Sequence, residues 1–149
     1  MSGLQRGAYS LYRYLIALFA AACVVQIYLA GRGVFGVHGG KKLDDQSSLD
    51  PHRALGEIIG LAAIVMFVCA LVVWRNRRLI GETFALAFMA EVLQHALALP
   101  KHPWVAGLHA VDGLAILGLA GMLAHRAWRG GQGADAVAAT AGGAGPNTP

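Results

Sequence analysis

The stretch His109-Ala-Val-Asp-Gly113-Leu-Ala-Ile lies in the last long apolar block of the chain, and His52-Arg-Ala-Leu-Gly56-Glu-Ile-Ile is a similar stretch earlier in it. In both, a glycine stands four residues after the histidine. Residues i and i+4 lie on the same face of a helix, so each imidazole has a bare strip of backbone beside it. The spacing therefore predicts two matching helices. In each, the glycine leaves space beside the histidine for a flat, bulky group.

Both stretches belong to long apolar blocks. The chain has 149 residues, of which 56% are hydrophobic and 13% are charged, whereas about 25% of the residues in a soluble domain are charged. A helix needs about 20 apolar residues to cross a hydrocarbon core of about 30 Å. The sequence therefore predicts an all-α integral membrane protein, a four-helix bundle within residues 1–129. The expected helices are 9–30, 51–74, 79–99 and 104–128, followed by a disordered Gly/Ala-rich tail, 130–149.

The charged residues predict how the chain crosses the membrane. The net charge is +4, but the basic residues flank the apolar blocks and form no patch with interleaved aromatics, so nucleic acid is not expected as a partner. One side of the bundle would carry Arg6, Arg13, Arg75, Arg77, Arg78, Arg126 and Arg129. The other would carry Arg32, Lys41, Lys42, Arg53 and Lys101, diluted by Asp44, Asp45 and Asp50. The positive-inside rule then places both termini in the cytoplasm, with the multi-pass chain in the cytoplasmic (inner) membrane.

An internal repeat relates the two halves of the bundle. When the first helix pair is moved onto the second, Gln26 falls on Gln94 and His52 falls on His109. Matches between polar residues inside apolar helices are less expected by chance than the many Leu and Ala matches. We therefore expect two helix hairpins related by duplication.

The repeat predicts a haem site. In a simple four-helix bundle the second and fourth helices lie diagonally across the core, which would make His52 and His109 face each other. Two imidazoles on opposite sides of one iron are the axial ligands of a six-coordinate haem. The predicted cofactor is haem b, and the residues expected to bind it are His52, Arg53, Gly56, His109, Gly113, Gln26 and Gln94, with Arg53 near a propionate.

His95 is an alternative ligand. It lies as deep in the bundle as His109, so the sequence leaves open whether His52 or His95 pairs with His109. Glu91, His95, His109 and Asp112 together also form a candidate metal site, although their spacing matches no zinc signature. A small transporter or metal-binding protein built on these four residues would need to oligomerise to make a translocation path.

The chain resembles an uncharacterised family of small bacterial four-helix membrane proteins. The resemblance covers residues 10 to 128 and rests on Gln26 with the glycines after it, on Asp50-x-His52-Arg53-x-x-Gly56, and on His109-x-x-x-Gly113. More distantly, His52-Arg53-x-x-Gly56 is similar to the His-Arg opening of haem-ligating helices in haem A synthases and other bis-histidine b-type membrane cytochromes. This resemblance implies haem ligation by His52 and His109. Leu49-Asp50-Pro51 stands where haem A synthases carry acidic and aromatic residues, so their oxygenation chemistry is not expected.

Three functions follow from these patterns. The first is a b-type haem protein that transfers electrons or senses redox state near the outer face of the membrane, with a quinone or another redox protein as partner. The second is a cofactor-free accessory protein whose polar residues fix helix packing. The third is the metal-binding or transport protein. The sequence has no nucleophile–base pair and no phosphate-binding loop, which argues against an enzyme unless it is a haem-dependent oxidoreductase.

Overall fold

The computed structural model describes residues 2–38, 46–73, 77–98 and 103–142. Its long helices are α1 (Gly3–His38), α2 (Asp50–Val73) and α5 (Pro103–Gly142). A further helical rod consists of α3 (Arg77–Phe88), the π-helical segment η2 (Met89–Leu93) and α4 (Gln94–Ala98). A short 3₁₀ turn, η1 (Gln46–Leu49), precedes α2. The described residues are therefore all helical, as the composition predicts.

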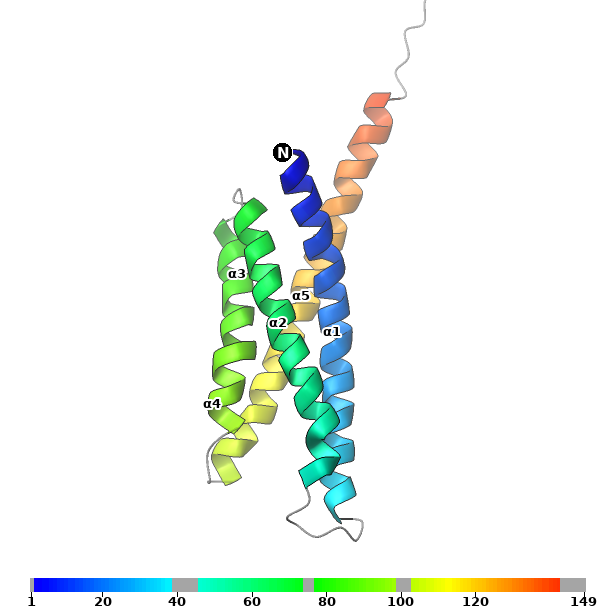
Figure 1. The fold of residues 1–149 in the computed structure, drawn as a ribbon. Coiled ribbons are helices and arrows are strands. Elements are labelled where there is room, and N and C mark those ends of the chain that lie inside the picture. Colours follow the sequence, from blue (N-terminus) through cyan, green and yellow to red (C-terminus); the bar gives the residue numbers. More distant parts are fainter. Residues whose placement is uncertain (1, 39–45, 74–76, 99–102, 143–149) are drawn as a thin grey trace, which may run out of the picture.

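The four rods form a bundle in which neighbours along the chain lie side by side (Figure 1). α1 packs against α2 and α5, while the rod α3–η2–α4 packs against α2 and α5 from the other side. Among the described residues, α2 and α5 make no close backbone contact with each other. The second and fourth helices thus lie diagonally across the core, so side chains that meet between them must reach through the centre of the bundle.

Three helices are long and apolar enough to cross a membrane, within Gly3–Val34, Asp50–Val73 and Gly107–Arg129. They carry large apolar side chains on their outward faces, among them Leu18, Ile58, Leu61, Val111 and Leu114. Such faces are stable against lipid. The chain is therefore a membrane protein. The rod α3–η2–α4 corresponds to the predicted helix 79–99, whose passage through the membrane stays a prediction.

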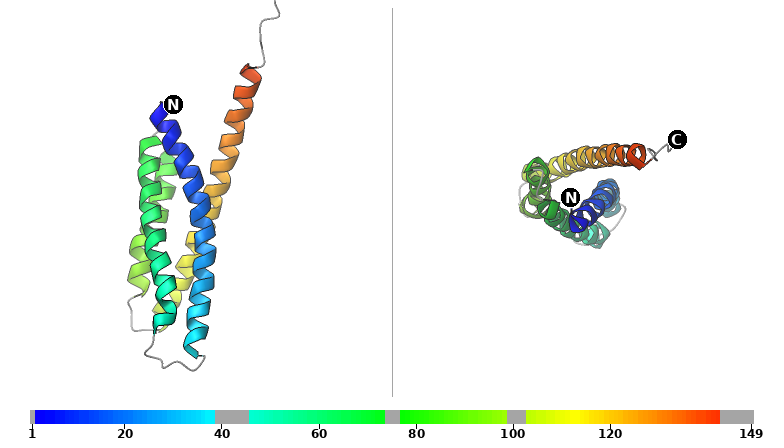
Figure 2. Two further views of the ribbon diagram at one scale, coloured as in Figure 1. Left: turned by 45° about the vertical axis from the view of Figure 1, so that its right-hand side comes forward. Right: turned by 90° about the horizontal axis from the view of Figure 1, so that it is seen from above.

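Both described ends of the chain lie at one end of the bundle, and α5 extends past the other helices there (Figure 2). The same end carries the described arginines of the predicted cytoplasmic set, which are Arg6, Arg13, Arg77, Arg78, Arg126 and Arg129. The cytoplasmic location of this end stays a prediction, and we call it the arginine end.

Three predicted helix ends were wrong. The first helix was expected at 9–30, but α1 begins at Gly3 and continues through the glycines after Ala30 to His38. At Gly33 the missing side chain lets Leu49 of η1 lie against the helix, and the Ser48 hydroxyl donates a hydrogen bond to the Gly33 carbonyl over 3.2 Å. Gly33 therefore serves packing rather than termination.

The tail after the last predicted helix was also expected to be disordered, yet α5 is helical through Gly142. This part of the chain is rich in alanine, the strongest helix former, and has no proline before Pro146. Residues 143–149 of the predicted tail lie outside the described part of the chain, as do residues 74 and 99 at two other predicted helix ends.

The π-helical segment interrupts a rod that the sequence predicts as a uniform helix, 79–99. The backbone N–H of Gln94 bonds to the Met89 carbonyl, one residue further back than in an α-helix. A π turn inserts an extra residue and rotates everything after it about the helix axis. Gln94 consequently faces α5, where it bonds to His109 and Asp112, while the His95 side chain lies near Glu57 of α2.

A polar contact crosses the core near the arginine end. Tyr12 and Thr83 are fully buried, and their hydroxyl oxygens lie 3.2 Å apart. The Thr83 hydroxyl donates its single proton to the Leu79 carbonyl over 2.7 Å, so Tyr12 must be the donor to Thr83. This bond connects α1 to α3, which lie diagonally opposite each other.

Removing the Tyr12 hydroxyl tests that connection. Tyr12→Phe keeps the buried ring but leaves Thr83 without its donor, so the free energy of unfolding should fall by about 0.5–1.5 kcal/mol. Tyr28→Phe is the control, because the Tyr28 side chain is exposed and should show almost no change. Denaturant titration of the detergent-solubilised protein measures both. Equal effects of the two variants would contradict the assigned bond.

Candidate functional site

A cavity of about 630 Å³ lies between the helices at the end of the bundle opposite the arginine end. It receives side chains from α1, α2, the rod η2–α4 and α5. All seven residues predicted to bind a cofactor line it, namely Gln26, His52, Arg53, Gly56, Gln94, His109 and Gly113. The structure therefore brings residues far apart in the sequence to one place, which we call the histidine cavity.

The rings of His52 and His109 lie near each other in this cavity. Their ring centroids are 6.2 Å apart and their planes make an angle of 72°. Metal–imidazole bonds are about 2.0 Å long and a ring nitrogen lies roughly 1.1 Å from its centroid, so two imidazoles bound in line to one ion have centroids about 6 Å apart. The spacing of the two rings therefore suits a shared metal ion.

Backbone carbonyls determine which nitrogen of each ring carries the proton. His52 Nδ1 lies 3.2 Å from the Gln26 carbonyl oxygen, and His109 Nδ1 lies 3.1 Å from that of Gln94. A carbonyl only accepts hydrogen bonds, so each Nδ1 is the protonated nitrogen. Neither Nε2 has a hydrogen-bond partner among the described residues, and in a neutral ring that atom keeps its lone pair. This is the arrangement in which metal-ligating histidines are usually held.

The same glutamines also hold the histidine backbone. Gln26 Nε2 donates to the His52 carbonyl over 2.8 Å, and Gln94 Nε2 donates to the His109 carbonyl over 3.0 Å. Each pair of residues thus exchanges two hydrogen bonds between neighbouring helices. We call these two contacts the Gln–His pairs, and they fix the register of α1 against α2 and of α4 against α5.

The glycines lie under the glutamine amides. A methyl group built on Gly56 would meet Gln26 Nε2 at 3.2 Å, and one on Gly113 would meet Gln94 Nε2 at 3.6 Å. The bare strip beside each histidine, which the sequence assigned to a flat ligand, is therefore contacted by an amide of the protein itself. The histidine–glycine spacing supports the Gln–His pair directly and the ligand only indirectly.

The two halves have matching contacts and one difference. Each contains a glutamine, a histidine and a glycine in the same mutual arrangement, although a common origin by duplication stays a prediction. Gln94 Nε2 additionally donates to Asp112 Oδ2 over 2.9 Å, and Asp112 is buried. Gln26 has no acid beside it, and its Oε1 is buried without a hydrogen-bond partner in the described part of the chain. The half that contains His109 thus has one additional hydrogen bond to a buried acid.

Asp112 stands three residues after His109, and the sequence grouped both in the candidate metal site. The structure instead bonds its carboxylate to Gln94, which in turn holds the His109 backbone. Asp112 therefore supports His109 through the glutamine.

The histidine considered as an alternative ligand has other partners. His95 Nδ1 lies 2.6 Å from the Glu91 carbonyl, and its Nε2 lies 3.6 Å from Glu57 Oε1 at the exposed rim of the cavity. The Glu91 carboxylate lies against Gly60 of α2. Within the described ranges no three or more His, Cys, Asp or Glu side chains could hold a metal ion together. The candidate metal site of Glu91, His95, His109 and Asp112 is therefore not assembled, because the π turn separates these side chains.

Arg53 lines the cavity at its rim and lies 3.4 Å from Asp50. The apolar walls come from residues that the site prediction did not include, such as Cys23, Ile59 and Ile116. The last two stand seven residues after His52 and His109, on the same helical face. That spacing could have identified the two isoleucines as cavity residues from the sequence. No pattern in the sequence indicated the π turn.

Comparison with known proteins gives a family without an activity. The sequence profile of DUF6220, a family of unknown function, matches residues 26–102. The match begins at Gln26 and includes His52 and Gln94, whereas His109 lies beyond it. No curated protein and no solved structure matches the chain.

The unequal surroundings of the two glutamines predict unequal effects. Gln94→Leu removes two hydrogen bonds and leaves the buried Asp112 carboxylate without its donor, so the free energy of unfolding should fall by about 1–3 kcal/mol. Gln26→Leu removes one bond but also an unpaired buried oxygen, and should cost at most about 1 kcal/mol. Denaturant titration in detergent compares them. Adding Asp112→Leu to Gln94→Leu should restore part of the loss, and an equal cost for both single variants would contradict the assignment.

Proposed function

Because the chain belongs to the family of unknown function DUF6220, which assigns it no activity, we propose its function from the histidine cavity. The protein is a membrane-embedded b-type haem protein, with His52 and His109 as the two axial ligands of one iron. It serves electron transfer or redox sensing in the bacterial cytoplasmic membrane, near the outer face.

The geometry of the two imidazoles supports the proposal most directly. They come from diagonally opposite helices, their centroids are 6.2 Å apart, and each Nδ1 is held by a carbonyl so that Nε2 is left to bind. Two histidines used only to hold helices together would not need this spacing. Holding a ring by its Nδ1 fixes its orientation and increases the basicity of Nε2.

The walls of the cavity also suit haem. Ligand cavities of about 300–1,000 Å³ with mainly apolar linings are typical of cofactor sites between bundle helices, and this cavity of about 630 Å³ falls in that range. Cys23, Ile59 and Ile116 make much of the lining apolar. Arg53 provides a positive charge at the rim, suited to a propionate.

Bound haem supplies one-electron chemistry at its iron. If His52 and His109 both held the haem iron, the group would supply electron transfer rather than oxygen activation. The protein's own part is to hold both rings through the Gln–His pairs and to exclude water. The proposed electron partner is a quinone or another redox protein of the same membrane.

An absorption spectrum tests the proposal. Protein expressed with ample haem and purified in detergent should show a Soret band, with sharp α and β bands after dithionite reduction. His52→Ala and His109→Ala should each lose the haem, while His125→Ala, an exposed histidine at the arginine end, should keep it. His109→Met, which still offers an iron ligand, should keep haem with a shifted spectrum.

The other outcomes are distinguishable. Loss of haem in His95→Ala but not in His52→Ala would make His95 the partner of His109. A colourless wild-type protein that remains folded would overturn the proposal. It would favour the cofactor-free alternative, in which the Gln–His pairs serve helix packing alone.

A further inference from the structure

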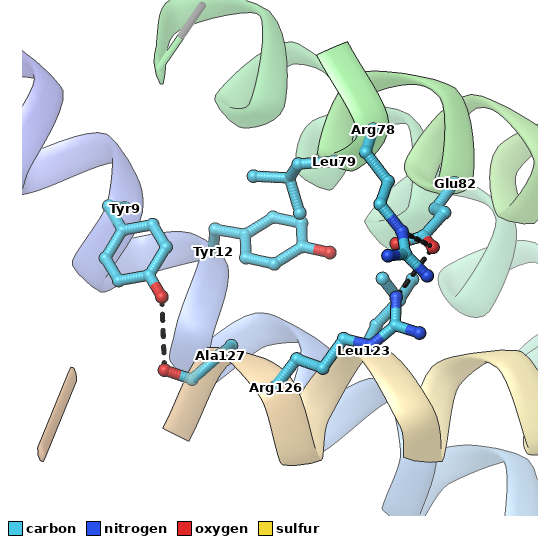
Figure 3. A pocket seen from close by; sticks show the side chains of 8 residues that line it. All are labelled: Tyr9, Tyr12, Arg78, Leu79, Glu82, Leu123, Arg126 and Ala127. Atoms are coloured by element: carbon cyan, nitrogen blue, oxygen red, sulfur yellow. Dashed lines mark hydrogen bonds and ion pairs between the residues drawn. The ribbon is translucent and has the colours of Figure 1, made fainter. Parts of the chain in front are cut away.

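A second cavity, of about 330 Å³, lies at the arginine end (Figure 3) and shares no lining residue with the histidine cavity. α1 contributes Tyr9 and Tyr12, α3 contributes Arg78 and Glu82, and α5 contributes Arg126. The proposed function does not use these residues. We call this space the arginine cavity.

One carboxylate oxygen holds both arginines. Glu82 Oε1 lies 2.9 Å from Arg78 Nε and 2.6 Å from Arg126 Nη1, so the guanidinium groups of α3 and α5 meet at a single atom (Figure 3). Two positive charges share one negative charge, which leaves the cavity with an excess of one positive charge. Both guanidinium groups are partly exposed beside the cavity, so the remaining positive charge can attract a further anion.

The tyrosines form walls rather than ligands. The Tyr9 hydroxyl donates to the Ala127 carbonyl over 3.2 Å, and the Tyr12 hydroxyl donates to Thr83. With their hydroxyl protons used, both side chains offer the cavity mainly their rings. Leu79 and Leu123 complete an apolar lining beside the arginines. A ligand that fits must therefore combine a compact negative charge with an apolar part.

We propose that the arginine cavity binds the phosphate of an anionic phospholipid headgroup. Guanidinium groups bind phosphate through two parallel hydrogen bonds. Basic pockets between membrane helices at the headgroup level are typical sites for anionic lipids, and tyrosine rings are enriched at that level. The cavity lies where α3 begins and near the last turn of the apolar span of α5, which covers Gly107–Arg129. A soluble phosphate would use the arginines but not the apolar walls.

Lipid-dependent thermal stability tests the proposal on the full chain. In detergent, phosphatidylglycerol should raise the melting temperature with a saturable dependence that gives an apparent Kd, because a ligand of the folded state stabilises it. Phosphatidylcholine, glycerol phosphate and inorganic phosphate should give much smaller rises. Arg126→Gln should weaken phosphatidylglycerol binding at least about tenfold, whereas Arg129→Gln, an equal loss of charge on the same helix, should leave the Kd unchanged.

A second variant distinguishes binding from mere packing. Glu82→Gln removes the negative charge that competes with the lipid, so it should tighten phosphatidylglycerol binding even if it lowers the melting temperature without lipid. An equal rise for inorganic phosphate would assign the site to a soluble anion and overturn the lipid proposal, as would equal Kd values for the wild type and Arg126→Gln. Haem absorbance of the same samples reports on the histidine cavity separately, and Arg126→Gln should not change it.

Discussion

Two pairs of reciprocal hydrogen bonds hold the half of the bundle that contains the histidine cavity. In each Gln–His pair, the imidazole Nδ1 bonds to the glutamine carbonyl and the glutamine amide bonds to the histidine carbonyl. Without water inside a membrane, an unpaired polar group costs several kcal/mol, so these groups have few alternatives to each other. The pairs therefore fix helix register and ring orientation together, and the cavity between the rings depends on both.

The π turn allows the second pair to form. In a uniform α-helix Gln94 would point in a different direction, but the extra residue of Met89–Leu93 turns it toward His109 and Asp112. The same rotation places His95 at the rim, near Glu57. One local irregularity thus decides which histidine of the second half lies inside. π turns inside α-helices occur often at functional sites, as expected if His109 is a ligand.

The two ends of the bundle use polar residues in different ways. At the histidine cavity the Gln–His pairs join uncharged amides, carbonyls and rings, and the buried acid Asp112 bonds to Gln94. At the arginine end, Glu82 joins Arg78 and Arg126, while Tyr12 and Thr83 cross the core beneath them. Charge at that end suits the headgroup level at which the lipid proposal places it. A redox site in the apolar interior and a lipid site at the interface are compatible with this division.

The length of the hydrophobic blocks by itself determined that the chain is helical and membrane-embedded. Helical spacing determined that His52 shares a helix face with Gly56, and His109 with Gly113. Those conclusions need only the period of the helix and the thickness of the bilayer. Only the tertiary structure decided that the glycines receive glutamine amides, that Asp112 bonds to Gln94, and that the rings stand 6.2 Å apart. It also extended α1 and α5 past their predicted ends. Contacts between helices depend on register and rotation, which a π turn changes without leaving a periodic signal in the sequence.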